Sequence, residues 1–337
     1  MKSKYLEMAL RTSPHITQGV DVEVIMRNVV YALLPLVAMA VYAFGLSALL
    51  LVLVCTPSAM AAEYAVARFS GKPSTIRDST AIITGLLLGL TLPPGFPLWM
   101  AAVGSVISIT LGKALFGGLG FNIFNPALVG RAFLQAAFPV AITTWHAPFT
   151  ADRFSEVIST TLALPLMKAV PAVTTGATPL AAMKFDHQLT ANLDLALGTV
   201  SGSLGETSAV LILLGGGYLA WRKMLDWRIP VGILTTALLL SGLFYLIDRS
   251  YPPPLFMLLS GGLMLGAVYM ATDMVTSPVT PQGVWIFAFI IGALTVIIRV
   301  WGGLPEGVMY AILLANGVTP LINWYTQPRI YGERKKS

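Results

Sequence analysis

The sequence is poor in charged residues, cysteine and histidine, and each shortage excludes a class of protein. Only 11% of its 337 residues are charged, whereas a soluble domain carries about 25% charged residues. Its single cysteine, Cys55, closes no disulfide within the chain and cannot supply the thiolates of a zinc or iron–sulfur site. The three histidines lie outside the apolar runs, which argues against a haem held between two helices. The low charge excludes a water-soluble fold, because so few charges could not cover its surface.

Apolar runs of roughly bilayer-spanning length fill most of the chain instead. Hydrophobic residues make up 56% of the sequence, and the mean hydropathy is +0.77. A helix needs about 20 apolar residues to cross the hydrocarbon core of a bilayer. We therefore predict an all-α polytopic membrane protein with about ten transmembrane helices. The predicted spans are residues 27–44, 47–67, 79–93, 97–114, 121–140, 205–221, 229–247, 254–271, 284–300 and 304–324.

Basic residues are unevenly distributed between the two sides of this predicted bundle. Fifteen of the 21 Lys and Arg residues fall within 1–27, 68–77, 113, 222–228 and 329–336, all on one face. Because cytoplasmic loops are enriched in Lys and Arg, we expect this face to be cytoplasmic, with both termini there. The basic clusters are then determinants of topology rather than a site for an anionic ligand.

The opposite face carries one long connection between spans. A connection of roughly 60 residues is unusual in a compact bundle and is commonly functional or disordered. We expect it to lie outside the cytoplasmic membrane. The predicted organisation is a cytoplasmic N-terminal segment (1–26), a first five-helix repeat (27–140), a periplasmic loop (141–204), a second five-helix repeat (205–324) and a cytoplasmic tail (325–337).

The two halves share an order of proline, glycine and asparagine that indicates an internal repeat. The matched features are Thr91–Pro94, Gly117–Gly118, Asn122 and Asn125–Pro126 in the first half, and Thr276–Pro278, Gly302–Gly303, Asn316 and Thr319–Pro320 in the second. Five spans per half would invert the second repeat in the membrane, as in many transporters. Coincidence is the alternative, since glycine and proline are common in membrane helices.

Two polar segments carry the candidate chemistry. In the first, Phe121–Arg131, two asparagines offer amide donors and acceptors, and Arg131 lies about two turns into a helix, where a bare cation needs a partner. The residues alone equally indicate a capped helix whose arginine pairs with a neighbouring carbonyl. In the second, Thr174–Leu180, a flexible Gly-Ala step presents Thr178. The residues alone indicate a turn with an exposed threonine.

At these segments the chain resembles the D subunit of the Rnf electron-transport complex and, more distantly, the B subunit of the sodium-pumping NADH:quinone reductase. The resemblance covers nearly the whole chain, beginning at Ser13-Pro-His15. In this family the final threonine of a Ser/Thr-Gly-Ala-Thr motif is esterified by the phosphate of FMN, which implies covalent FMN on Thr178. Family asparagines hold a second, non-covalent flavin, which implies riboflavin at Asn122 and Asn125. One departure is Ala172, where relatives often carry an aspartate.

The resemblance also implies a fold, a function and partners. The fold is a urea-transporter-like inverted repeat in the bacterial inner membrane, with the flavin loop in the periplasm. The function is electron transfer between the two flavins within a translocase-type oxidoreductase complex that is linked to ferredoxin and NADH and coupled to Na⁺ or H⁺ transport. The implied partners are membrane lipid and the other Rnf subunits, among them a second FMN-carrying subunit and iron–sulfur subunits, with no nucleic acid.

The repeat alone favours a different function, a urea-transporter-like solute channel or transporter without a redox role. The chain shows no general acid–base pair, nucleophilic triad or phosphate-cradling glycine loop, so we assign no catalytic residue and no metal ligand. Gly215–Gly217 lies within a predicted span, where close helix packing explains it. Asp273, at the cytoplasmic end of the eighth span, is either part of an ion path or a helix-end residue that faces water.

Overall fold

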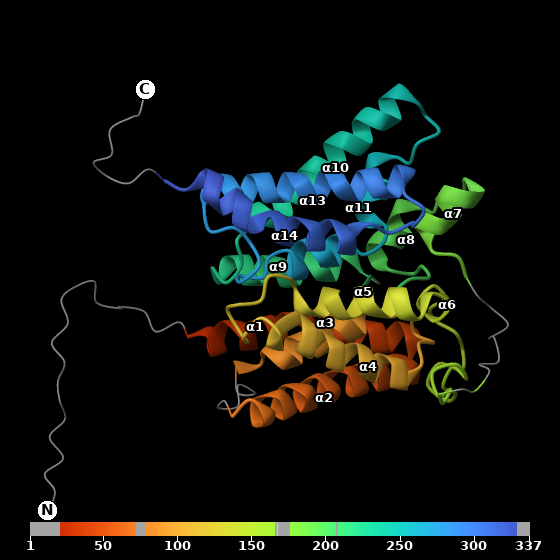
Figure 1. Ribbon diagram of the computed structural model, residues 1–337. Coiled ribbons are helices and arrows are strands. Elements are labelled where there is room, and N and C mark those ends of the chain that lie inside the picture. The colour runs from red at the N-terminus through yellow and green to blue at the C-terminus, as the bar shows by residue number, and fades with distance from the viewer. Residues whose placement is uncertain (1–20, 72–77, 166, 168–175, 207, 329–337) are drawn as a thin grey trace, which may run out of the picture.

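The computed structural model describes residues 21–71, 78–165, 167, 176–206 and 208–328, and every regular element in these ranges is helical. Figure 1 shows their arrangement. The first group comprises α1 (Val22–Phe44), α2 (Leu46–Phe69), α3 (Thr80–Thr91), α4 (Leu98–Ile109), the π-helical turn η2 (Thr110–Ala114), α5 (Pro126–Ala137) and α6 (Pro139–Ile142). Two short helices follow, α7 (Pro179–Asp186) and α8 (Asn192–Leu197). The last group comprises η3 (Leu204–Glu206), α9 (Ala209–Trp221), α10 (Arg228–Ile247), α11 (Pro254–Leu259), α12 (Leu263–Leu265), the π-helical turn η4 (Gly266–Met270), α13 (Pro281–Trp301) and α14 (Val308–Thr326).

Four of these helices are long and apolar enough to cross a membrane. They are α1, α2, α10 and α13, which have between 20 and 24 residues each. Three shorter apolar helices accompany them: α3, α4 with its continuation η2, and α9. The described chain is thus all-helical, with the lengths and composition of a polytopic membrane protein.

Two of the predicted spans differ from the helices that the structure contains. The run 254–271 is not one helix, because the chain turns at Ser260–Gly262, where Gly261 has a φ of +65°. Glycine adopts this conformation without the steric cost that a side chain would add. The run 121–140 becomes helical only at Pro126, because the Asn125 side chain caps the first turn of α5. An apolar run reveals neither a turn nor a cap.

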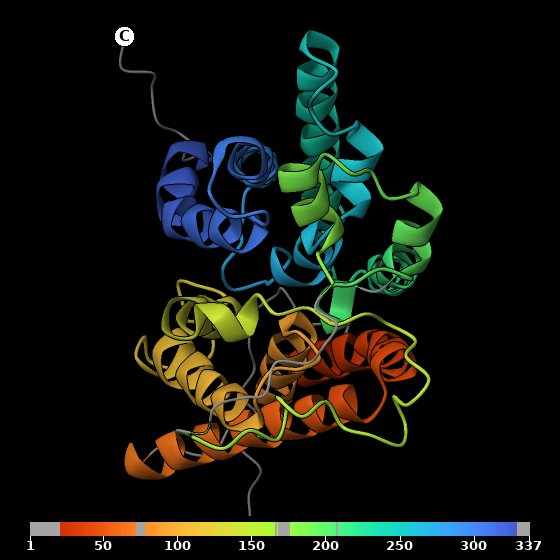
Figure 2. The same ribbon diagram turned by 90° about the vertical axis from the view of Figure 1, so that its right-hand side faces the viewer.

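The two groups of helices pack in the same order. In the first group α2 packs against α3 and α4, and α4 packs against α5. In the second, α10 packs against α11 and α13, and α13 packs against α14. Across the boundary between the groups α1 contacts α9 and α5 contacts α14. Figure 2 shows the groups on either side of this boundary. The helices that follow α2 and those that follow α10 thus contact one another in the same order.

The sequence features of the repeat fall partly at equivalent places. The Thr91–Pro94 stretch precedes α4 as Thr276–Pro278 precedes α13, and a pair of glycines follows each of these two helices. The asparagine positions do not correspond, because Asn125–Pro126 begins α5, whereas Thr319–Pro320 lies late in α14. This part of the predicted match is wrong. The same residue types recur in both halves, but they stand at different distances from the start of a helix.

Close helix packing explains two glycines of the 215–217 run. A Cβ atom at Gly215 would lie 2.0 Å from the Tyr269 hydroxyl, and one at Gly216 would lie 2.5 Å from Val268. A Cβ at Gly217 would meet no atom within 4 Å. The first two glycines therefore let α9 approach η4.

A buried ion pair joins α2 to the end of α4. The Lys113 ammonium on η2 lies 2.8 Å from Glu63 Oε1 on α2 and donates to Thr80 Oγ1 at 2.6 Å. Each charged side chain is only 6% exposed. Lys113 therefore belongs to the interior of the helix group, although its place in the sequence suggested a cytoplasmic loop. An apolar environment makes a bare cation costly, so a nearby carboxylate is the expected partner.

His146 is buried against the turn between α3 and α4, and its titration should affect stability. A Cβ atom at Gly95 would lie 2.3 Å from the imidazole Cε1, and neither ring nitrogen has a partner among the described residues. Burial lowers the pKa of His146 below its ordinary value of 6.5. As the pH falls below 6.5, the unfolded chain therefore binds a proton at His146 more readily than the folded chain does. The free energy of unfolding decreases over this range.

The expected result is a thermal midpoint in detergent that decreases from pH 7.5 to 5.5 more steeply in the wild type than in His146→Asn. The asparagine variant lacks the titrating ring, so its profile isolates the contribution of His146. Parallel profiles for the two proteins would show that the imidazole is solvated or already paired.

Candidate functional site

Thr178 caps the short helix α7. Its backbone is extended, with φ of −68° and ψ of 153°, and its Oγ1 accepts a hydrogen bond from the Ala181 N–H at 3.2 Å. Pro179 occupies the first helical position, where its missing N–H costs nothing and its fixed φ suits a helix. The Ser/Thr hydroxyl is one of the preferred caps for a helix N-terminus. Thr178 therefore stands where backbone N–H groups and the helix dipole favour an anion.

The segment before Thr178 is held on two sides. The Gly176 N–H donates to the Trp145 carbonyl at 3.1 Å, and a Cβ at Gly176 would lie 2.7 Å from Ser201 Oγ. Thr178 itself is only 5% exposed. The expected exposed threonine is thus wrong, because α7 packs this residue against the chain near residues 200–206 and 259–261. Thr174, Thr175 and Ala172 lie outside the described residues.

A large cavity, called here the outer cavity, borders the residues just before and after Thr178. Its volume is about 540 Å³, within the range of roughly 300–1,000 Å³ that small-molecule sites occupy. Its lining comes from four segments: Arg131 and Gln135 of α5; Ile142, Thr143, Thr144 and Trp145; Gly176, Ala177, Ala181 and Phe185; and Leu304, Pro305 and Glu306. Both aromatic rings and charged groups therefore border a space of ligand size.

Arg131 and Glu306 form an ion pair at the wall of the outer cavity. The Arg131 Nη2 lies 3.1 Å from Glu306 Oε2, and Glu306 Oε1 accepts from the Gly262 N–H at 3.2 Å. The Nη1 of Arg131 is buried and has no partner within the part of the chain that the structure describes. The partner of Arg131 is thus a carboxylate 175 residues away rather than a neighbouring carbonyl, and the pair links α5 to the start of α14.

Lys184 anchors α7 to the end of α13. Its ammonium donates to the carbonyls of Arg299, at 3.0 Å, and Leu304, at 3.2 Å, and also to the Gly302 carbonyl. These carbonyls lie at and just beyond the C-terminal end of α13, which ends at Trp301 and where the helix dipole favours a cation. Partial burial lowers the pKa of Lys184 from its usual value. The helix that begins at Thr178 is thereby fixed to the second group of helices.

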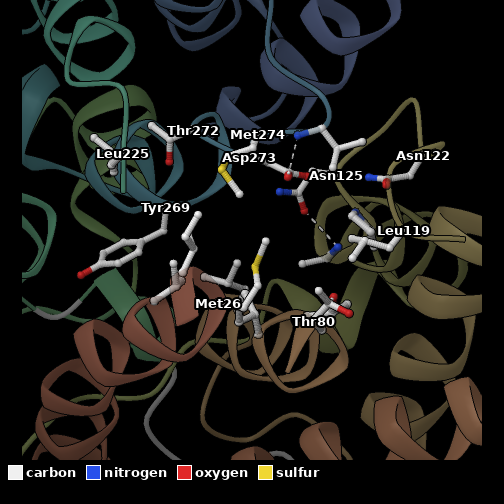
Figure 3. A pocket seen from close by; sticks show the side chains of 18 of the residues that line it. Met26, Thr80, Leu119, Asn122, Asn125, Leu225, Tyr269, Thr272, Asp273 and Met274 are labelled. Carbon is white, nitrogen blue, oxygen red and sulfur yellow. Dashed lines mark hydrogen bonds between the residues drawn. The ribbon is translucent and has the colours of Figure 1, made fainter. Parts of the chain in front are cut away.

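A second cavity, called here the inner cavity, lies beside the start of α5 (Figure 3). Asn122 and Asn125 line it together with Lys113, Tyr269 and Asp273. Asn125 caps α5, since its Oδ1 accepts from the Ala127 N–H at 3.0 Å, and its amide donates to the Met270 carbonyl at 3.0 Å. The structure thus brings the two predicted asparagines together at one cavity.

Asn122 and Asp273 present polar groups at the inner cavity. The Oδ1 of Asn122 is buried and has no partner within the described ranges, whereas its amide donates to the Phe124 carbonyl at 3.3 Å. Asp273 is half-buried, accepts from the Val275 N–H at 3.2 Å and borders this cavity in Figure 3. It therefore faces the inner cavity.

Sequence reasoning missed three contributors to these cavities. Lys113 borders the inner cavity. Its position inside an apolar run could have identified it, because a cation there is usually paired or functional. Glu306 borders the outer cavity, and only the need of Arg131 for a partner pointed to an unidentified carboxylate. Tyr269, whose hydroxyl donates to the Ala32 carbonyl at 3.1 Å, gave no local signal.

The two cavities lie toward opposite ends of the helices. In Figure 1, α6, α7 and α8 are at the end where α1 finishes, whereas α1 begins and α14 finishes at the other end. The outer cavity is lined from α7, and the inner cavity is lined from the first residues of α1 and the segment before α5. They approach each other along α5, where Ala127 lines the inner cavity and Arg131, one turn further on, lines the outer cavity.

Comparison with known proteins gives one consistent result over nearly the full length. The chain is 43% identical to the D subunit of the proton-translocating ferredoxin:NAD(+) oxidoreductase complex of Clostridium ljungdahlii, over 97% of this chain and 96% of the relative. It is 43% identical to the D subunit of the Na(+)-translocating ferredoxin:NAD(+) oxidoreductase complex of Acetobacterium woodii, over 98% and 97%. It is 41% identical to the D subunit of the ion-translocating oxidoreductase complex of Stutzerimonas stutzeri, over 94% of each. Residues 9–332 match the NQR2, RnfD, RnfE family, and this multi-pass membrane protein therefore belongs to that family.

Proposed function

We propose that this chain is the flavin-carrying membrane subunit of an Rnf-type ion-translocating oxidoreductase, with FMN joined to Thr178 by a phosphoester. The observation that carries the proposal is the position of Thr178 at the N-cap of α7, beside a cavity of about 540 Å³. A phosphoester at this position would place negative charge at a helix N-terminus, which stabilises anions. Family membership and the names of the relatives support the assignment.

The residues of the outer cavity fit a flavin. Trp145 and Phe185 offer aromatic surfaces, and Arg131 and Glu306 offer polar groups for the ring edge. The bound flavin would supply one- and two-electron redox chemistry, and the protein would set its potential through hydrogen bonds, charge and burial. Within this chain, Lys184 and Gly176 hold the attachment segment in place.

We assign the inner cavity to the second flavin, riboflavin. The unpartnered Asn122 Oδ1 would accept a hydrogen bond from an imide N–H such as that of the flavin ring. The cavity measures only about 90 Å³, which admits a ring edge but not a whole flavin. Binding would therefore have to displace flexible side chains such as Met26, which borders the cavity in Figure 3.

Further features of the proposal follow from the basic-residue pattern and the duplicated packing order. Ten spans in two inverted five-helix repeats, of urea-transporter type, would place the inner cavity toward the cytoplasm and Thr178 toward the periplasm of a bacterial inner membrane. Electrons would pass between the two flavins and reach this chain from other subunits, among them a second FMN-carrying subunit and iron–sulfur subunits. Ferredoxin and NADH would react elsewhere in the complex.

The proposal is tested by in-gel fluorescence of the purified, denatured chain under ultraviolet light. A fluorescent band that survives denaturation is expected, because a phosphoester withstands the loss of the fold. No band from cells with an active flavin transferase would contradict the proposal and favour the solute channel or transporter that the repeat alone suggests.

Asn122→Leu should weaken binding of the non-covalent flavin, lower its content in the purified chain and leave covalent FMN unchanged. Leucine has a similar volume but no acceptor for the ring, and the loss of one buried hydrogen bond costs a ligand roughly tenfold in affinity. The measurement is chromatography of the flavins that acid precipitation releases, with the precipitated chain assayed for FMN separately. The matched control is Asn192→Leu on α8, which is exposed and borders neither cavity. Riboflavin content equal to that of the wild type would remove Asn122 from the site.

We infer that Asp273 takes part in coupling electron flow to ion movement. Its carboxylate lies at the inner cavity together with Lys113, and intramembrane or membrane-edge carboxylates commonly serve ion paths. Asp273→Asn should preserve flavin content and reduce ion uptake into vesicles per electron transferred. Unchanged electron transfer together with unchanged ion uptake would exclude it.

A further inference from the structure

Two carboxyl groups from distant parts of the chain meet at the turn between α11 and α12. Glu206 lies in η3, immediately before α9, and Glu306 lies immediately before α14. A Cβ atom at Gly261 would lie 2.9 Å from Glu306 Oε1, and one at Gly262 would lie 3.1 Å from Glu206 Oε1. The Gly262 N–H also donates to Glu306 Oε1 at 3.2 Å, so the carboxyl groups of Glu206 and Glu306 converge on the same two residues of this turn. The two glycines leave the space that these carboxyl groups occupy.

Two carboxyl groups that converge in this way favour sharing one proton over carrying two negative charges. Two ionised carboxylates repel each other and offer no hydrogen to share, so protonation of one of the pair relieves the repulsion.

The positive charges around the pair do not remove this preference. Arg131 of α5 donates to Glu306, and the Gly262 N–H also donates to it. Arg299 of α13 instead donates to the carbonyls of Met257, at 2.5 Å, and Ser260, at 3.0 Å. Lys184 of α7 is engaged with carbonyls at the end of α13. Only one of the three cations therefore bonds directly to a carboxylate of the pair.

The pair lies between the outer cavity and the small space beside Thr178. Glu306 lines the outer cavity, and Glu206 lies in the small space that also borders Thr178. A shared proton would thus lie between the attachment residue and the cavity that the flavin ring would occupy. A flavin ring takes up protons when it is reduced. A carboxyl pair at the wall of the outer cavity could supply one of these protons and recover it when the ring is oxidised.

We propose that Glu206 and Glu306 hold one shared proton, which passes to the flavin of the outer cavity on reduction and returns on oxidation. The proposal rests on the proposed FMN at Thr178. In the forward step a reduced redox centre of a neighbouring subunit is oxidised and its electron enters the ring. An O–H bond of the pair breaks, an N–H bond of the ring forms, and the second negative charge left on the pair faces Arg131. When the ring is oxidised, its electron passes to the next redox centre of the complex, the ring N–H bond breaks, and the O–H bond of the pair forms again.

The shared proton can be tested without reference to the flavin. Glu206→Gln replaces the protonated carboxyl with an amide that donates at every pH. The wild type should lose thermal stability as the pH rises from 7 to 10, because the proton leaves and the two carboxylates repel, whereas Glu206→Gln should lose less. Lys184 and the arginines are common to both proteins, so the difference between the profiles isolates the pair. Coincident profiles would overturn the shared proton.

The link to the flavin is tested by infrared difference spectra of the purified complex, recorded between its oxidised and reduced states. A protonated-carboxyl band that changes on reduction and shifts in D₂O is expected in the wild type and in the control Glu156→Gln, whose carboxylate is exposed in the outer loop. The band should be absent in Glu206→Gln and, as a second variant, in Glu306→Gln.

The outcomes separate this inference from the proposed function. A wild-type chain that carries covalent FMN but shows no redox-linked carboxyl band refutes the proton exchange and leaves the flavin assignment intact. A band that persists in both glutamine variants assigns it to other carboxyl groups and also refutes the exchange. A wild-type chain without flavin refutes the proposed function and the exchange with it, while the pH profiles still report whether the pair holds a proton.

Discussion

Thr178→Asn is expected to yield a folded chain with no covalent flavin. Asparagine caps a helix as well as threonine does, so the hydrogen bond to the Ala181 N–H has a replacement acceptor, but its amide cannot form the phosphoester. In-gel fluorescence should fall to background, and electron transfer through the complex should fall with flavin occupancy. The thermal midpoint of the chain in detergent should stay close to that of flavin-free wild-type protein.

Two further substitutions separate capping from attachment. Thr178→Ala removes both the cap and the ester, and the lost cap costs about 1 kcal/mol. Thr178→Ser keeps the cap and a hydroxyl, so part of the covalent flavin should remain. Covalent flavin in the asparagine variant at the wild-type level would place the ester on another residue.

Lys113→Met is expected to cause the largest loss of stability. The substitution leaves the Glu63 carboxylate in the interior without the Lys113 ammonium, and breaking a buried ion pair on one side typically costs about 3–5 kcal/mol. A clear drop in thermal midpoint and in yield from the membrane should follow. Because Lys113 also lines the inner cavity, non-covalent flavin should decrease as well.

The double variant Lys113→Met with Glu63→Met is the matched control for this effect. The double variant does not leave the Glu63 carboxylate in the interior without the Lys113 ammonium, so it should be more stable than Lys113→Met alone. Equal stability of the wild type and Lys113→Met would show that water reaches the pair and screens it.

Composition and the lengths of the apolar runs predicted the helical class and the positions of the main helices. Each predicted apolar run contains at least one helix of the structure, because hydrophobic length is a property of the local sequence. The turn at Ser260–Gly262 escaped prediction, since the apolar composition continues through it and only the backbone of Gly261 records it. The start of α5 at Pro126 could have been placed better, because Asn-Pro is a common N-terminal signal.

The sequence identified residues of the candidate site, but not their burial or their partners. The sequence motif pointed to Thr178, and nothing near it in the sequence indicated that packing against residues 200–206 would bury it. Arg131 required a partner by its place in an apolar run, yet Glu306 lies 175 residues further on. Glu206 and Glu306 are likewise far apart in the sequence, so no local pattern joins them. Such contacts depend on how the two groups of helices assemble.

Mass spectrometry of the peptide that contains residues 169–184, isolated from the purified chain, tests the central claim most directly. We expect the added mass of FMN on Thr178 and unmodified side chains at Thr174 and Thr175. Flavin on a different threonine, or an unmodified peptide from cells with an active flavin transferase, would contradict it.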